Sequence, residues 1–429
     1  MRSLSRNTIL LFLLISVWTS SFSQTLQPAP PSSVRVSEER LKRIDVLIQQ
    51  YIDSGWINGA TALIARDGKI VYHKGLGFDD VLSKKPLPKD AIMRIASQTK
   101  AVTSVAVMML YEEGKFLLDD AISKFIPEFK NPVVLDKFNE ADTTYTTVPA
   151  KSEITIRQLL THTSGIHYAQ IGNKTFNAIY AKAGIVAGIG VDRIKLADIM
   201  RKLGPLPLAH QPGEKFTYGL NTDLLGYLVE KVSGMSFDNF LKKRIFDPLG
   251  MKDTWFYLPA EKQNRLATLY TEDDSKHIQK APETMDINGT FYSDYPKMNG
   301  TYFSGGGGLV STAYDYAVFM QMLLNNGVYN GKRILSRNTI RMMTTNQIGD
   351  IALGHGNAFG LGFEVVTEKG SAFSPRPKGS YSWGGMFSSS YWIDPEEKMV
   401  AQFFLQLYPN SHDDIHEKFQ ILAYQALND

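Results

Sequence analysis

The amino-acid sequence predicts a mixed α+β fold, in which strands from both ends of the chain build one antiparallel sheet and helices fill the middle. Near the start, two short apolar runs in residues 60–72 flank the turn Arg66-Asp67-Gly68, which is typical of a hairpin. Strand patterns return only near the other end, in residues 362–366, 389–393 and 399–405. Both ends of the chain are therefore expected to meet in the sheet.

Helical patterns account for most of the remaining chain. Residues 38–52 carry apolar side chains at the spacing of an amphipathic helix, and residues 100–113 are apolar almost all round, which predicts a buried helix that ends at Gly114. Further helices are predicted in 156–161, 194–203, 223–232, 237–246 and 415–427. We therefore expect a sheet part in about 38–95 and 330–429, with a mostly helical inserted part in about 96–329.

The first residues have the pattern of a secretory signal peptide, which we place at 1–23. Arg2 and Arg6 precede a mostly apolar stretch in 9–18, and Ser21-Phe22-Ser23 fits a small-x-small cleavage site. The apolar stretch is about half the length that spans a bilayer, so we expect cleavage and no transmembrane anchor after processing. The mature protein is therefore expected in the periplasm or outside the cell.

Pro, Ser and Gln dominate residues 24–37, which predicts a short disordered lead-in ahead of one folded domain in 38–429. The chain has no cysteine, so disulfides, cysteine nucleophiles and thiolate metal sites are excluded. Its 46 Lys and Arg nearly balance 43 Asp and Glu, without a long basic run, so nothing indicates nucleic acid as a partner.

No cofactor or metal pattern stands out. The four glycines at 305–308 lack the lysine of a phosphate-binding loop, and a tight turn that brings the backbone close to a pocket is the better interpretation. His412 and His416 have a spacing that can bind a metal, but Asp413 and Asp414 between them favour a solvated helix face. We expect neither a metal nor an organic cofactor.

Ser97-Gln98-Thr99-Lys100 is the one Ser-x-x-Lys pattern in the chain, and it lies at the start of the predicted buried helix. Residues three apart share a helix face, so the Lys100 amine can reach the Ser97 hydroxyl. Burial and the positive end of the helix dipole both disfavour a charged ammonium and favour a neutral amine that accepts the serine proton. The pattern predicts a Ser97 nucleophile; taken alone, it also fits a capping serine followed by a surface lysine.

Several further motifs follow in order along the chain. They are Leu159-Leu160-Thr161-His162-Thr163-Ser164-Gly165, Gln211-Pro212-Gly213, Phe246-Asp247-Pro248-Leu249-Gly250-Met251, Gly305-Gly306-Gly307-Gly308 and Trp383-Gly384-Gly385. In content, order and spacing, the chain from about Leu41 onward resembles class C β-lactamases and penicillin-binding-protein-like serine hydrolases, and looks closest to their family VIII esterase branch. The resemblance implies the β-lactamase/transpeptidase-like fold, with the site in the cleft beside the sheet.

The resemblance assigns roles to three motifs. Ser97 and Lys100 match the first, and Tyr218 matches the tyrosine of the second, Tyr-x-Asn, which acts as general base and later activates the deacylating water. The third position of that motif is Leu220, and an asparagine follows one residue later. Because the family's asparagine helps to hold a substrate amide, Leu220 is expected at the substrate and amide recognition is in doubt.

The third motif departs further from the family pattern. Trp383-Gly384-Gly385 stands where β-lactamases and peptidases have Lys-Thr-Gly or His-Thr-Gly, so the resemblance places these three residues at the substrate. A lysine there pairs with a substrate carboxylate, whereas tryptophan offers apolar surface and one N–H, which suits an uncharged ester or amide. Core packing is the other interpretation of Trp383. The N–H groups of Ser97 and Met386 are expected to form the oxyanion hole.

These expectations favour a serine hydrolase that forms an acyl-enzyme on Ser97, with a small-molecule ester as substrate or an acyl group passed to another alcohol. A D-alanyl peptidase, amidase or weak β-lactamase is the second hypothesis, and a non-catalytic penicillin-binding-like protein is the third. The family treats the segment with His162 and Ser164 as a structural turn rather than a catalytic Ser–His pair. Segments 165–191 and 283–303 are expected to shape the pocket.

Overall fold

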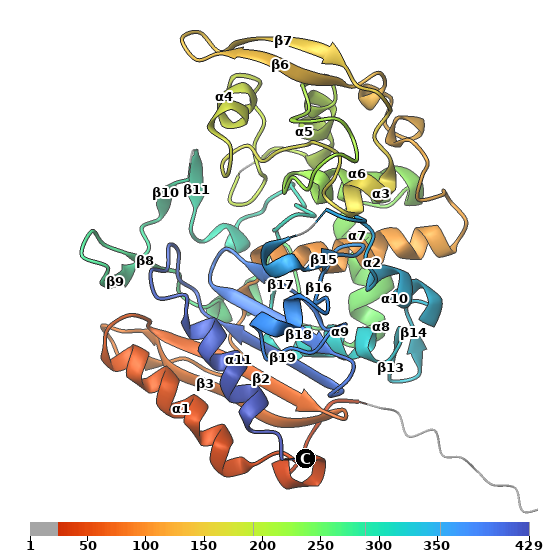
Figure 1. The fold of residues 1–429 in the computed structure, drawn as a ribbon. Helices are drawn as coiled ribbons and strands as arrows, with labels where there is room; N and C mark the ends of the chain where they lie inside the picture. The colour runs from red at the N-terminus through yellow and green to blue at the C-terminus, as the bar shows by residue number, and fades with distance from the viewer. Residues whose placement is uncertain (1–24, 192, 288, 352, 429) are drawn as a thin grey trace, which may run out of the picture.

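The computed structural model describes residues 25–191, 193–287, 289–351 and 353–428. Figure 1 shows a sheet part that holds both ends of this range, and a helical part that is topped by the hairpin of β6 (Val133–Asn139) and β7 (Thr144–Pro149). The predicted signal peptide lies outside the described residues. Within them, no helix has the length and apolar character needed to cross a membrane.

One nine-stranded sheet forms the centre of the sheet part, in the order β1-β3-β2-β19-β18-β17-β16-β15, with β4 paired to β3. Its strands are β1 (Gln27–Pro28), β2 (Gly59–Arg66), β3 (Lys69–Asp80), β4 (Lys85–Pro86), β15 (Ala358–Phe359), β16 (Glu364–Val365), β17 (Tyr381–Gly385), β18 (Ser389–Asp394) and β19 (Met399–Phe404). Antiparallel pairing of β2 with β19 joins the two ends of the chain. The predicted sheet is confirmed, except that the short β1 pairs with β3 in parallel.

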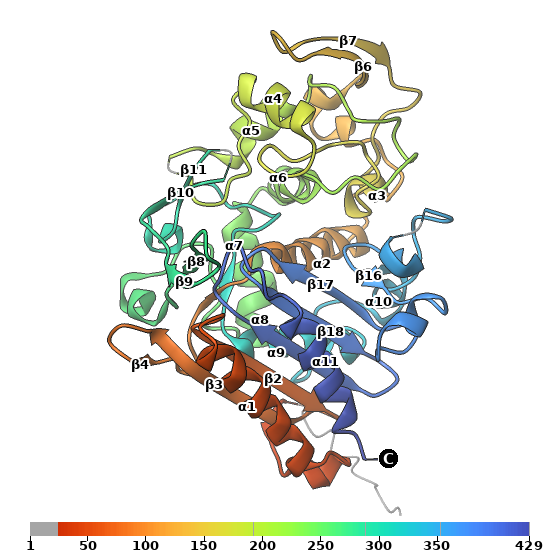
Figure 2. The same cartoon turned by 60° about the vertical axis from the view of Figure 1, so that its left-hand side comes forward.

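Helices cover both faces of the sheet. α1 (Glu38–Asp53) and α11 (Ile415–Gln425) lie side by side on one face (Figure 2), and α9 (Ala313–Leu324) packs on β19 and β2 from the other. Successive side chains of a strand point to opposite faces, so Ala62 and Ile64 pack with α1, and Leu63 and Ala65 pack on the other side. Because α9 belongs to the sheet part, that part begins before the predicted residue 330.

The helical part centres on the contact between α2 (Thr99–Glu112) and α6 (Asn221–Ser233). The described residues also form the α-helices α3 (Ile156–Leu160), α4 (Lys174–Lys182), α5 (Leu196–Leu203), α7 (Phe237–Leu241), α8 (Asp247–Leu249) and α10 (Arg337–Met343). The predicted helices are confirmed, although 237–246 ends in a π-helical turn at Lys242–Phe246. Short strand pairs complete the fold: β5 (Met93–Arg94) with β12 (Val310–Ser311), β8 (Tyr270–Glu272) with β9 (Ile278–Lys280), β10 (Thr284–Asp286) with β11 (Thr290–Tyr292), and β13 (Val328–Tyr329) with β14 (Lys332–Arg333).

The lead-in that the sequence predicts to be disordered is structured from Thr25 onward. Its β1 strand pairs with β3, and Pro31–Val34 form a 3-10 helix. Leu26 is 1% exposed and Val36 is 4% exposed. The prediction was wrong because a mostly polar composition hides these two apolar anchors, whose burial offsets the loss of chain entropy.

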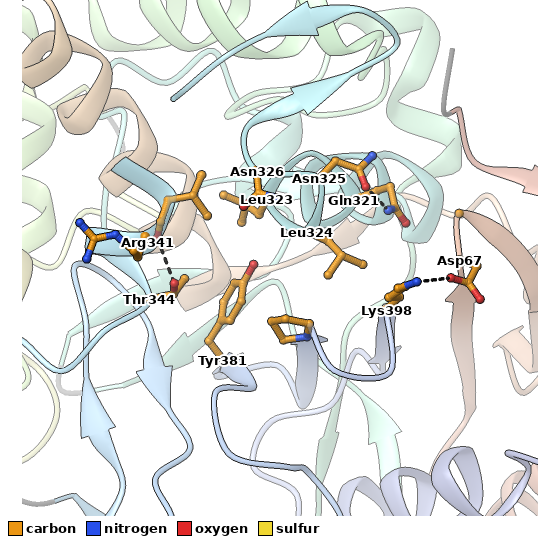
Figure 3. A pocket seen from close by; sticks show the side chains of 13 residues that line it. Asp67, Gln321, Leu323, Leu324, Asn325, Asn326, Arg341, Thr344, Tyr381 and Lys398 are labelled. Atoms are coloured by element: carbon orange, nitrogen blue, oxygen red, sulfur yellow. Dashed lines mark hydrogen bonds and ion pairs between the residues drawn. The ribbon is translucent and has the colours of Figure 1, made fainter. Parts of the chain in front are cut away.

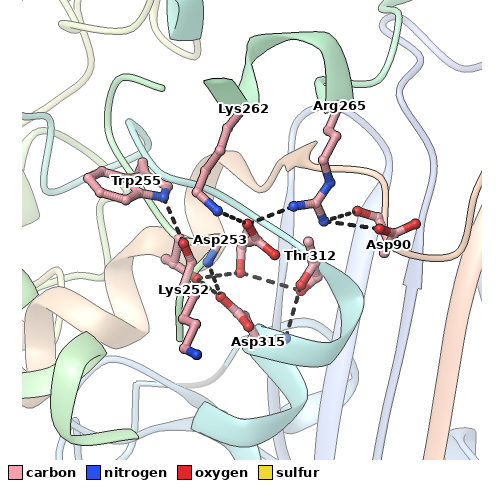
Figure 4. Close-up of polar contacts among 10 residues, drawn as sticks. Asp90, Lys252, Asp253, Trp255, Lys262, Arg265, Thr312 and Asp315 are labelled. Atoms are coloured by element: carbon pink, nitrogen blue, oxygen red, sulfur yellow. Dashed lines mark hydrogen bonds and ion pairs between the residues drawn. The ribbon is translucent and has the colours of Figure 1, made fainter. Parts of the chain in front are cut away.

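A polar cluster holds the segment after α8 against the start of α9 (Figure 4). Asp253 accepts from Lys262 at 2.6 Å and from Arg265 at 2.8 Å. Its backbone N–H donates to the Asp315 carboxylate at 2.6 Å, and the Asp315 N–H donates to the Thr312 hydroxyl that caps α9. Burial outweighs these hydrogen bonds and raises the pKa of Asp315 to about 6.

We expect Asp315 to make folding less favourable as the pH rises from about 4 to about 6. The pKa of this carboxyl is raised in the folded chain relative to the unfolded chain, so its stabilising contribution is present at low pH and is lost through this window. A difference of about two in pKa corresponds to about 3 kcal/mol. Urea unfolding between pH 4 and 7 should show a weaker pH dependence for Asp315→Asn than for the wild type.

Asp198→Asn is the matched control, because Asp198 is an exposed aspartate in α5. This variant should keep the pH dependence of the wild type. If Asp315→Asn and the wild type lose the same stability between pH 4 and 6, the role assigned to Asp315 is wrong.

Candidate active site

Ser97 lies in a tight turn at the start of α2, beside the end of β17. Residues Ala96–Gln98 form a 3-10 turn that runs into α2. The buried Ala96 has a φ of 44°, in the left-handed region that a residue with a Cβ rarely adopts. Gly385 approaches this turn so closely that a Cβ on it would lie 2.5 Å from the Ile95 carbonyl oxygen. The approach places Met386 in the wall of the same cavity as Ser97.

The Lys100 amine is buried among three oxygen atoms. Nζ donates to the Ser97 hydroxyl at 3.2 Å, to the Tyr168 hydroxyl at 2.7 Å and to the Gly306 carbonyl at 2.6 Å. The residue is only 2% exposed. Its place in the first turn of α2 directs the side chain back toward Ser97, as the spacing predicts. The amine is therefore within reach of the hydroxyl that it is predicted to deprotonate.

Tyr218 and Trp383 lie next to this pair. The Lys100 Nζ lies 4.5 Å from the centre of the Tyr218 ring. The Trp383 Nε1–H donates to the Tyr218 hydroxyl at 3.2 Å. Ser97, Tyr218 and the segment from Trp383 to Met386 line one cavity. The structure thus brings together the predicted nucleophile, the predicted proton carriers and the third motif.

Tyr168 is a site residue that the sequence analysis missed. Its hydroxyl contacts Lys100, and its ring centre lies 5.2 Å from that of Tyr218. Burial, followed by the Tyr218 phenol and the Asp223 carboxylate, raises the pKa of Tyr168 well above its ordinary value. The phenol therefore stays neutral at ordinary pH. The one available signal was its place in segment 165–191, which was expected to shape the pocket.

His162 packs against Tyr218 and does not form a catalytic pair with a serine. Its ring is buried with its centre 4.9 Å from that of Tyr218, and Nδ1 accepts from the Asn221 amide at 2.9 Å. Burial, and then the charge of Lys100, lower the pKa of His162 well below its ordinary value, which keeps the ring neutral. This geometry agrees with the structural-turn interpretation.

Leu220 and Asn221 do not lie at the substrate position. Leu220 caps the start of α6, is fully buried in the core and lines neither cavity that contains Ser97. Asn221 is also fully buried, and its amide oxygen accepts from the Ser164 hydroxyl. The expectation that Leu220 contacts substrate is therefore wrong, because the start of α6 turns its side chain into the core. The asparagine fixes the turn with His162 and Ser164 instead.

The four glycines at 305–308 bring backbone to the site, as predicted. The Gly306 carbonyl accepts from Lys100. A side chain at Gly306 would collide with the Asp223 carboxylate, so the turn requires glycine there. Asp223 is fully buried and accepts from the Ser304 hydroxyl at 2.7 Å, and burial raises the pKa of Asp223 to about 6.

Two cavities meet at Ser97. One of about 590 Å³ contains Tyr218 and Trp383 and extends along β17 toward α11. The other, of about 150 Å³, is lined largely by residues of 165–191 and 283–303, the segments expected to shape the pocket. A third cavity of about 660 Å³ lies at the end of α9 near Tyr381 (Figure 3), and its lining includes none of the predicted catalytic residues.

His412 and His416 contact different partners. The His412 ring stacks on Trp56 with ring centres 4.2 Å apart, whereas His416 Nδ1 lies 2.8 Å from the Ser390 hydroxyl. Burial lowers the pKa of His416 to about 4. In the part of the chain that the structure describes, no cluster of three or more His, Asp or Glu side chains could hold a metal ion.

The fold and the site define a serine hydrolase of the β-lactamase type. Residues 44–426 match the Beta-lactamase family, and the chain belongs to this family. Esterase EstB from Burkholderia gladioli is 28% identical over 82% of this chain and 86% of its own length. A putative D-alanyl-D-alanine carboxypeptidase from Escherichia coli K12 is 29% identical over 87% of this chain and 84% of its own length.

Among solved structures, EstCE1, a hydrolase with promiscuous acyltransferase activity, superposes with a TM-score of 0.78 at 27% identity. The superposition covers 90% of this chain and 99% of EstCE1. The fold and the resemblance predicted from the sequence are therefore confirmed.

We expect Tyr168→Phe to slow the labelling of Ser97 by a fluorophosphonate about tenfold to a hundredfold, because a hydrogen bond to an amine that handles a proton is worth about 1.5–3 kcal/mol. Tyr218→Phe should slow labelling by about 10²–10⁴, the usual effect of losing a general base. Time-resolved mass spectrometry of the intact protein measures both rates.

Tyr180→Phe is the matched control for Tyr168→Phe. Tyr180 is a buried tyrosine whose hydroxyl accepts from the His167 N–H at 3.3 Å. This variant should label at the wild-type rate. If Tyr168→Phe also labels at the wild-type rate, Tyr168 has no role in the acylation of Ser97.

Proposed function

We propose that this protein hydrolyses carboxylic esters, or transfers their acyl group to another alcohol, through an acyl-enzyme on Ser97. The observation that carries the proposal is the contact between Trp383 and Tyr218. Where β-lactamases and peptidases have a cation, this chain has an uncharged indole whose N–H donates to the Tyr218 hydroxyl. The likeness to Esterase EstB and to the hydrolase EstCE1 supports the same reaction class.

The geometry supports a two-step reaction. Ser97 Oγ attacks the ester carbonyl carbon while its proton passes into the Lys100–Tyr218 pair, and the N–H groups of Ser97 and Met386 hold the oxyanion. The tetrahedral intermediate collapses, the bond to the alcohol oxygen breaks, and the alkoxide takes the proton back. Water then attacks the acyl carbon as Tyr218 accepts its proton. The bond between that carbon and Ser97 Oγ breaks, Tyr218 returns the proton to Oγ, and the acid leaves.

The lining of the two cavities favours a substrate without a recognised carboxylate. Among the described lining residues, Arg376 is the one Lys or Arg. Its guanidinium already lies 3.5 Å from the Glu364 carboxylate and donates to the Ser382 hydroxyl. A β-lactam or peptide carboxylate would therefore find no unpaired cation there, whereas an uncharged ester needs none.

A D-alanyl peptidase, amidase or weak β-lactamase is the second candidate. The likeness to a putative D-alanyl-D-alanine carboxypeptidase favours it. The same nucleophile and proton carriers can open an amide bond. The buried position of Asn221 speaks against it, because that side chain fixes a turn rather than facing substrate. A non-catalytic binding protein, the third candidate, does not explain why Lys100 is held against Ser97.

Export is a separate proposal that rests on the pattern of residues 1–23. We expect the protein to leave the cytoplasm with this segment removed. Fractionation of expressing cells, followed by mass determination of the mature protein, checks this: an unprocessed chain in the cytoplasm would contradict it.

Mass spectrometry of adducts on Ser97, together with an assay of ester turnover, separates the three functions. The protein should gain one fluorophosphonate adduct on Ser97, hydrolyse p-nitrophenyl acetate with turnover, and form no lasting penicillin adduct. Ser97→Ala should lose both the adduct and turnover. A stable penicillin adduct with negligible ester turnover would favour the second candidate, and the absence of any adduct on Ser97 would leave only the third.

A further inference from the structure

The larger cavity continues from Ser97 around β17 to the face of the sheet that α11 covers. Successive side chains of a strand point to opposite faces, so Trp383 lies with Tyr218, and the next residue, Gly384, belongs to the face of α11. A Cβ on Gly384 would meet the Ser389 carbonyl oxygen at 3.2 Å and, beyond the chain neighbours, no other described atom within 4 Å. The missing side chain therefore leaves a passage between the nucleophile and α11.

Polar side chains line the far part of this cavity and bond to one another. Ser374 donates to the Gln420 side-chain oxygen at 3.2 Å, and His416 Nδ1 lies 2.8 Å from the Ser390 hydroxyl. The Arg376 guanidinium donates to the Ser374 hydroxyl oxygen at 3.2 Å. These bonds hold side chains from α11, from β18 and from the loop before β17 in fixed positions, as a binding site for a particular ligand requires.

The same wall offers hydrogen-bonding groups to a ligand. Among the described residues, the Gln420 amide nitrogen has no acceptor, and the Glu417 carboxylate and Glu364 Oε2 have no donor. A hydroxyl group is both a donor and an acceptor, so a ligand with several hydroxyl groups matches this wall. The rings of Phe373, which is 62% exposed, and Trp383 add apolar faces to the cavity. A sugar ring combines apolar C–H faces with a rim of hydroxyl groups and fits both features.

The position of Tyr218 decides that the alcohol part of an ester occupies this cavity. The alkoxy oxygen must take a proton as it leaves, so it belongs beside the Tyr218 hydroxyl. Tyr218 lines the larger cavity and not the smaller one. The alcohol part therefore extends past Trp383 and Gly384 toward α11.

We propose that the larger cavity is a carbohydrate subsite and that the natural ester is a sugar with an acyl group on one of its hydroxyl oxygens. This inference rests on the proposed ester-hydrolase function. Ser97 Oγ bonds to the acyl carbon, the bond from that carbon to the sugar oxygen breaks, and this oxygen leaves with a proton as a free hydroxyl. Water then releases the acyl group as the acid.

Other alcohols fit this cavity less well. An aliphatic alcohol would displace water from Gln420, Glu417 and Glu364 without replacing the hydrogen bonds of that water. A peptide with a free carboxylate would find no unpaired cation among the described lining residues, because Arg376 donates to Ser382 and lies beside Glu364.

Two acetate esters that differ in their ring hydroxyl groups test the subsite: methyl glucoside acetylated on its primary hydroxyl, and cyclohexylmethyl acetate. Both release a primary alcohol and leave the same acetyl group on Ser97. The wild type should hydrolyse the glucoside ester with a kcat/KM at least about tenfold higher, the effect of about two net hydrogen bonds. An assay of released acetate measures both rates.

Gln420→Ala and Glu417→Ala should each lower the ratio of the two kcat/KM values about threefold to tenfold, because each removes a hydrogen-bonding group from the sugar. A variant that only loosens the structure would slow both esters alike and leave the ratio unchanged. Gln425→Ala is the matched control, since Gln425 lies in the same helix but bonds to Arg40 and Arg43 of α1. This variant should keep the wild-type ratio.

The outcomes are distinct. Equal kcat/KM values for the two esters in the wild type, or a preference that neither Gln420→Ala nor Glu417→Ala lowers, would overturn the carbohydrate subsite while leaving ester hydrolysis intact. A ratio that falls as far in Gln425→Ala would also overturn it. Absence of turnover with both esters and with p-nitrophenyl acetate, together with fluorophosphonate labelling of Ser97, would instead overturn the proposed function itself.

Discussion

The buried amine of Lys100 is the constraint on which the site depends. Burying an amine is costly unless other groups replace its hydration, and here oxygen atoms of Ser97, Tyr168 and Gly306 do so. Two of these partners lie 68 and 206 residues further along the chain. The loop with Tyr168 and the glycine turn must therefore both pack against the start of α2 before the Lys100 amine has all three hydrogen bonds. Assembly of the site is thereby tied to the packing of these distant segments of the helical part on one another.

Trp383 shows how one framework can serve different substrates. Pairing of Trp383 with Tyr391 and of Gly385 with Ser389 fixes the path of β17 through its backbone. The side chain at position 383 can then change from a cation to an indole without moving Gly385, whose contact with the Ile95 carbonyl holds the strand against the nucleophile turn. Acylation and substrate recognition thus depend on separable parts of the strand.

The sequence predicts what local patterns and motif order encode. α1, the β2–β3 hairpin and α2 follow from the spacing of apolar residues, and the place of Tyr218 follows from the order of motifs. Tyr168 could not be predicted in the same way, because its role arises from one contact with a lysine in a distant helix. Leu220 was misplaced because a substitution in a motif does not show where the new side chain points. The lead-in was misjudged because two buried anchors outweigh the polar composition around them.

The glycine turn links the chemistry of the site to the wall of the smaller cavity. The Gly306 carbonyl accepts from Lys100, and the next residue, Gly307, lies against Ile189, which lines that cavity. Moving this turn to widen the cavity would also withdraw the carbonyl that holds the amine, at a cost of about 1.5–3 kcal/mol. The size of the cavity can therefore change at low cost only through side chains on its walls, such as Ile189 and those of segment 283–303. This explains why a rigid proton-transfer group can coexist with a cavity built from loops.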